Sequence, residues 1–103
     1  FRRGARIADG FIFAERYGDV FECLERTRGY LKENGRSDAD FGKHLTTHAS
    51  TPLEAVPDVL ARWRDVGGTH ASISTMGKGT TTTQEHVDFI GRAADALGKA
   101  GLL

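Results

Sequence analysis

Cysteine is almost absent from this chain of 103 residues, in which Cys23 is the only one. A single cysteine excludes an internal disulfide and favours a reducing compartment. Long apolar runs are also lacking: no stretch approaches the ~20 residues needed to span a bilayer, and the N-terminus has no apolar core of the kind found in signal peptides. These absences predict a soluble, cytoplasmic protein.

A surplus of charge of one sign is missing as well. The 14 Lys and Arg residues balance the 14 Asp and Glu residues, and both kinds are scattered along the chain. This balance argues against nucleic acid or an anionic membrane as the main partner. The length allows one domain over residues 1–103, and a domain of about 100 residues buries only about two-thirds of its unfolded surface.

What the chain does contain is one pattern repeated three times: a strand-like run, a polar loop and a helical stretch. The runs are Gly10–Ala14, Lys43–His48 and Thr69–Thr75. Strands that alternate with helices in this way indicate βα units and a parallel α/β sheet. Functional groups in such proteins lie on the loops that follow the strands.

Apolar spacing and capping residues predict the helices between these runs. Asp19 is expected to cap the first, which should end near Asn34–Gly35, and Thr-to-Glu capping boxes are expected at Thr51–Glu54 and Thr82–Glu85. Pro57 should bend the second helix or delay its regular part. The predicted inward residues are Val20, Leu24, Thr27 and Leu31 in the first helix; Val56, Leu60, Trp63 and Val66 in the second; and Val87, Ile90, Ala94 and Leu97 in the third.

Two of the three strands have one polar face. His44, Thr46 and His48 share a face of the second run, while His70, Ser72 and Ser74 share a face of the third. Buried parallel strands are usually apolar on both faces. A barrel wall, whose inner face can be polar, therefore fits better than an open doubly wound sheet, and a polar face exposed on a partial sheet is the alternative.

Several segments together resemble a known family. They are Arg2–Phe13, Thr51–Glu54, Trp63–His70, and Met76–Gly77 ahead of Glu85–His86. In order and spacing they resemble the C-terminal part of the bacterial luciferase-like monooxygenases, most closely the coenzyme F420-dependent branch. The resemblance implies the last three βα units of a (β/α)8 TIM barrel that binds coenzyme F420 or reduced FMN and acts on a small-molecule substrate by monooxygenation or hydride transfer.

The candidate ligand contacts are the residues that end the strands or begin the following loops: Ala14, Glu15, His48, Ser74, Thr75, Met76 and Gly77. A hydrogen bond to a neighbouring strand is the alternative role for His48. No metal site is expected, because His44 and His48 on one strand lie roughly 13 Å apart. His70, at the opposite end of its strand, is interpreted as structural.

Two other functions remain open at this point. The chain could be a non-catalytic half-barrel that forms a homo-oligomer or docks on a partner to cover its open edges, rather than joining the remaining part of a barrel. A flavodoxin-like binding domain is a third interpretation, although its strands should be more apolar than these.

Overall fold

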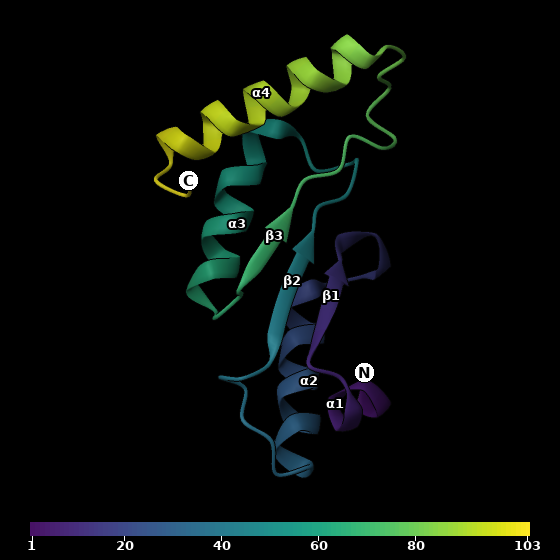
Figure 1. The fold of residues 1–103 in the computed structure, drawn as a ribbon, viewed down its shortest axis with the longest axis vertical. Coiled ribbons are helices and arrows are strands. Elements are labelled where there is room, and N and C mark those ends of the chain that lie inside the picture. The colour runs from purple at the N-terminus through teal and green to yellow at the C-terminus, as the bar shows by residue number, and fades with distance from the viewer.

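The computed structural model describes residues 1–103 as a mixed α/β fold with a three-stranded parallel sheet and four α-helices (Figure 1). This confirms the predicted α/β class. In chain order the elements are α1 (Arg2–Ile7), β1 (Gly10–Ala14), the 3-10 turn η1 (Glu15–Tyr17), α2 (Val20–Glu33), β2 (Gly42–Thr46), the 3-10 turn η2 (Leu53–Ala55), α3 (Val56–Asp65), β3 (His70–Ser72) and α4 (Thr83–Lys99).

The strands lie side by side in chain order, β1-β2-β3, and both pairs are parallel. Phe13 is paired with Leu45, and Leu45 with Ala71, so these residues share one face of the sheet. The third strand is shorter than predicted and ends at Ser72. Its continuation leaves the sheet as a turn in which the Ser74 hydroxyl accepts the N–H of Met76 at 3.1 Å.

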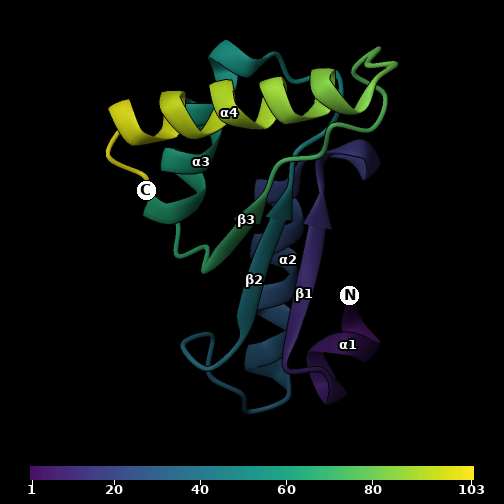
Figure 2. The ribbon, with the colours of Figure 1, turned by 45° about the horizontal axis from the view of Figure 1, so that its top comes forward.

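Helices α2 and α3 both cover this face. The main core joins Phe13 and Leu45 of the sheet to buried side chains of both helices, namely Val20, Leu24, Val56, Leu60 and Trp63, with Leu97 of α4 at its border. The predicted inward stripe of α2 is confirmed, since all four of its residues are buried. Figures 1 and 2 agree that α2 lies behind the sheet.

Trp63 is the anchor between α3 and the sheet. It is 2% exposed, and its ring centroid lies 5.4 Å from that of Phe13. Its indole N–H donates to the backbone carbonyl of His70 at 3.0 Å. The indole thus contributes apolar area and also fixes β3, which has few other contacts with the helices.

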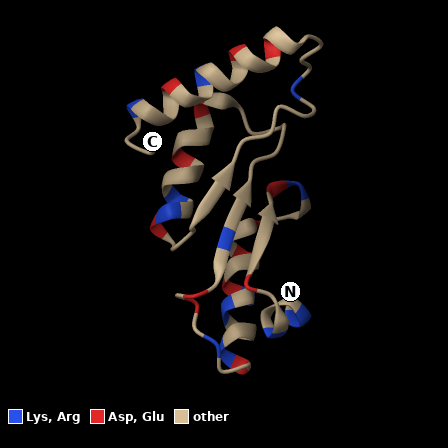
Figure 3. Cartoon of the chain, viewed as in Figure 1, with Lys and Arg blue, Asp and Glu red and all other residues tan.

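One charged side chain lies within the covered face. Lys43 is 3% exposed; its Nζ donates to the Asp38 carbonyl at 2.7 Å and lies 3.3 Å from Asp38 Oδ1. Arg28 binds the other carboxylate oxygen at 3.2 Å. Burial lowers the pKa of Arg28, but Glu25 and Asp38 outweigh this effect and raise it overall. The remaining charge lies on helices and loops, as Figure 3 shows.

The predicted capping box at Thr51–Glu54 is wrong. The Thr51 hydroxyl instead donates to Glu15, and α3 begins only at Val56, after η2. Pro57 occupies the first turn of α3, where its missing N–H costs nothing, so the expected delay of the regular helix is confirmed. The box at Thr82–Glu85 is also confirmed, because the Thr82 hydroxyl accepts the N–H of Glu85 at 3.2 Å.

The predicted inward face of α4 is largely wrong. Phe89, Ala93 and Leu97 are the buried residues, whereas Val87 is 57% and Ile90 is 47% exposed. The helix crosses the end of the sheet toward which the strand arrows point (Figures 1 and 2), and Phe89 there lies under the Lys78 ammonium, 5.4 Å from its ring centroid. Because α4 crosses the sheet in this way, the stripe of Phe89, Ala93 and Leu97 faces inward instead of the predicted one. No helix has the length and apolarity required to cross a membrane.

Candidate functional site

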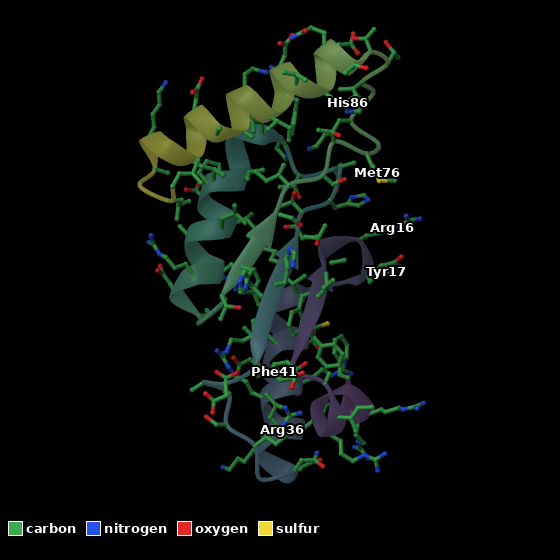
Figure 4. The ribbon with its side chains drawn as sticks, in the orientation of Figure 1. Arg16, Tyr17, Arg36, Phe41, Met76 and His86 are labelled. Atoms are coloured by element: carbon green, nitrogen blue, oxygen red, sulfur yellow. The ribbon has the colours of Figure 1, made fainter.

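The carboxyl ends of the strands surround a shallow hollow of about 320 Å³. We call its lining residues the rim; Figure 4 shows Arg16, Tyr17 and Met76 on the same side of this end of the sheet. The loops after all three strands contribute to the rim, as expected for a parallel sheet. It consists of Ala14, Arg16, Tyr17, Thr46, Thr47, His48, Ala49, Ser74, Met76 and Gly77.

Most of the predicted contact residues come together in this hollow. Ala14, His48, Ser74, Met76 and Gly77 line it, although they come from three separate segments of the chain. Glu15 and Thr75 do not line it. The Thr75 carbonyl instead accepts the backbone N–H of Lys78 at 3.3 Å within the loop before α4.

Glu15 supports the rim from the side. Its Oε2 accepts the backbone N–H of His48 at 2.8 Å and the Thr51 hydroxyl at 2.7 Å. The Lys78 ammonium donates to the carbonyl of Thr51 at 2.5 Å. One carboxylate therefore ties the end of β1 to the loop after β2, and a lysine ties that loop to the one after β3. Glu15 is a positioning residue for His48.

The hydrogen bonds of His48 determine which of its ring nitrogens carries the hydrogen. Its Nδ1 lies 3.2 Å from the backbone N of Ser50 and 2.8 Å from the Ser50 hydroxyl. A backbone N–H can only donate, so Nδ1 accepts and Nε2 carries the hydrogen in the neutral ring. His48 thus offers an N–H donor suited to a carbonyl or an anionic oxygen.

The loop after β3 reaches the rim through a tight turn. Gly77 has φ of 76°, and a Cβ there would lie 3.0 Å from the Cβ of Ala49. A side chain at this position would be strained and would press on the loop after β2. Met76, which is 81% exposed, stands beside this turn and offers a flexible apolar surface to a ligand.

Sequence reasoning missed part of the rim. Arg16 and Tyr17 were not among the candidate ligand contacts; Arg16 forms no ion pair and lies 5.8 Å above the ring of Tyr17, which is 82% exposed. Their place directly after β1 was the available signal. With His48, they make the rim suitable for a ligand that combines a planar ring with anionic or carbonyl oxygens.

Below the rim, the face of the sheet opposite the helices carries a polar ladder. His44 Nε2 lies 3.0 Å from the Ser72 hydroxyl, which lies 3.1 Å from the hydroxyl of Thr46. Ile12, paired with His44 on this open face, is 68% exposed. The side chains here bond across strands rather than to a covering helix.

No three or more His, Cys, Asp or Glu side chains gather in a way that could hold a metal ion. The fold and the rim define the chain as a mixed α/β protein with a parallel sheet and a hollow at its carboxyl end. Comparisons with protein-family models, curated proteins and solved structures found no match.

Proposed function

We propose that this chain is the C-terminal part of a luciferase-like oxidoreductase barrel that depends on coenzyme F420 or reduced FMN, and that it contributes part of the cofactor and substrate rim. The observation that carries the proposal is the one-sided covering of a parallel sheet whose strands follow chain order. The family itself is suggested by the sequence segments described above.

One-sided covering distinguishes a barrel wall from a doubly wound sheet. Doubly wound sheets place helices on both faces and reverse strand order at the site where ligands bind. A (β/α)8 barrel keeps its helices outside and its strands in sequence. Here α2 and α3 pack on the face of Phe13 and Leu45, and the opposite face carries hydroxyls and imidazoles. Such a polar face suits the inside of a barrel.

The rim offers suitable groups for such a cofactor. The Arg16 guanidinium and the Nε2–H of His48 would bind anionic or carbonyl oxygens, while Tyr17 and Met76 would lie against the ring system. Glu15 would keep the backbone of His48 in place. When bound, the cofactor supplies the hydride or oxygen chemistry, and these residues orient it and exclude water.

The test is a titration of the protein encoded by the complete reading frame with reduced F420 and, separately, reduced FMN. We expect saturable binding of one of them, followed by its absorbance under anaerobic conditions. His48→Ala should weaken binding, whereas His70→Ala, which removes an imidazole at the far end of the same face, should leave it unchanged. Absence of binding by both cofactors would overturn the proposal.

A second candidate function is a non-catalytic half-barrel that associates with another copy. It is favoured by the exposed apolar side chains of Ile12, Val87 and Ile90 and by the unpaired outer edges of β1 and β3. Light scattering of this chain separates the alternatives. A defined dimer that binds neither cofactor would support association, and a stable monomer would contradict it.

A further inference from the structure

His44 and His70 come together on the open face, although they are far apart in sequence. The register pairs them on β2 and β3, and their ring centroids lie 6.4 Å apart with an angle of 43° between the planes. His44 is half-buried and His70 is exposed. The spacing of His44 and His48 along one strand argued against a metal, but the neighbouring strand supplies a closer imidazole.

The hydrogen bonds of His70 leave its outer nitrogen with a free lone pair. The Thr69 hydroxyl donates its only hydrogen to the Lys43 carbonyl at 3.0 Å and accepts the Lys43 N–H at 2.8 Å. Nδ1 of His70 lies 2.9 Å from this hydroxyl, so Nδ1 must be the donor. In the neutral ring, Nε2 is then unprotonated and has no hydrogen-bond partner in the protein.

His44 can adopt the complementary arrangement. Its Nε2 bonds to the Ser72 hydroxyl, which can pass its own hydrogen to Thr46. Nδ1 of His44 has no partner and is then the nitrogen with the lone pair. Metal-binding histidines generally donate their other ring N–H to a neighbouring polar group in this way.

We propose that His44 and His70 form a two-histidine site for a divalent transition-metal ion that prefers imidazole, such as Ni²⁺, Cu²⁺ or Zn²⁺, with water completing its coordination. Zn–N bonds of about 2.1 Å place two imidazole centroids about 5–6 Å apart. The observed separation of 6.4 Å is slightly larger, so the exposed ring of His70 has to move toward His44 when the ion binds. The backbone of His70 is held meanwhile by Trp63, whose indole N–H donates to its carbonyl.

This site does not depend on the proposed redox function, because it lies on the strands away from the rim. The experiment is calorimetric titration of the untagged chain with NiCl₂, with imidazole nitrogen NMR in the presence of ZnCl₂. Loss of an outer hydrogen-bond partner costs about 10- to 100-fold in metal affinity, so loss of a ligand should cost at least 10-fold. We expect one ion per chain and a loss of that size for His70→Gln and for His44→Gln.

The matched control is His48→Gln, which changes an imidazole on the same face at the rim and should leave the affinity unchanged. His70 is exposed, so His70→Gln remains informative if His44→Gln disturbs the fold. Two results would overturn the proposal. One is no binding by the unaltered chain at ion concentrations up to about 1 mM. The other is equal weakening by all three variants, which would mean that the ion binds nonspecifically to several separate histidines.

Discussion

The two faces of the sheet are built from different chemistry. The face toward α2 and α3 carries Phe13 and Leu45, both at most 2% exposed, and its one charged residue, Lys43, is paired. The opposite face carries Ile12, 68% exposed, beside cross-strand hydrogen bonds among His44, Thr46 and Ser72. Stability therefore resides on the covered face, and the open face remains free for a ligand or a further layer of protein.

The largest expected effect tests the covered face. Trp63→Ala removes a buried ring and the hydrogen bond to His70, and should lower the free energy of unfolding by about 3–5 kcal/mol. Urea denaturation followed by circular dichroism measures this. Tyr17→Ala, at an 82% exposed ring, is the control and should change stability by less than about 0.5 kcal/mol. Equal effects would contradict the assignment of the stabilising core to the covered face.

A smaller loss of stability is expected when Asp38, the partner of the buried Lys43 ammonium on the covered face, is changed. Asp38→Asn leaves the ammonium of Lys43 buried beside Arg28 without its carboxylate, and should cost about 1–3 kcal/mol in the same denaturation experiment. Adding Lys43→Met to this variant removes the unpaired charge and should restore part of the stability. If the double variant is no more stable than Asp38→Asn, the unpaired charge of Lys43 is not the cause of the lost stability.

The start of α4 gives a smaller, pH-dependent effect. The backbone N–H of Thr81, and then that of Thr82, donates to the Glu85 carboxylate and lowers the pKa of Glu85 below its usual range. A lowered carboxyl pKa contributes stability above the unfolded value and loses it as the pH falls through the folded value. Thermal unfolding between pH 7 and pH 3 should show this loss, and Glu85→Gln should flatten it. An unchanged profile in Glu85→Gln would contradict this role.

The smallest effect is expected on the open face. Ile12→Thr replaces a largely exposed side chain on β1 and keeps its β-branched shape, so the free energy of unfolding should change by less than about 0.5 kcal/mol. Denaturation of this chain alone measures it. A loss above about 1 kcal/mol would mean that Ile12 is packed in the isolated chain and that the two faces do not differ in burial.

Local sequence signals predicted much of the fold. Asp19 caps α2 as expected, accepting the N–H of Phe21 at 2.9 Å, and the α2 stripe needed only helical periodicity. The capping box at Thr51 could not be excluded from the sequence, because the competing partner, Glu15, lies 36 residues away. The inward face of α4 depended on how the helix crosses the sheet, which no local pattern specifies.

The site was predictable to a similar extent. Strand ends identified five of the residues that line the hollow, because parallel strands end at the same edge. The pairing of His44 with His70 required the register between strands, and the turning of Glu15 toward His48 required the position of the following loop. Both depend on the tertiary structure, which the spacing of residues in the sequence does not specify.

The central proposal is that the open face of the sheet is the inside of a larger barrel. Thiol labelling at position 12 tests it most directly, in the protein of the complete reading frame with Cys23→Ser removing the native thiol. Ile12→Cys should react much more slowly than Glu25→Cys, whose side chain on α2 is 69% exposed. Equal labelling rates would mean that the open face lies in solvent, and would contradict the proposal that it lines the inside of a barrel.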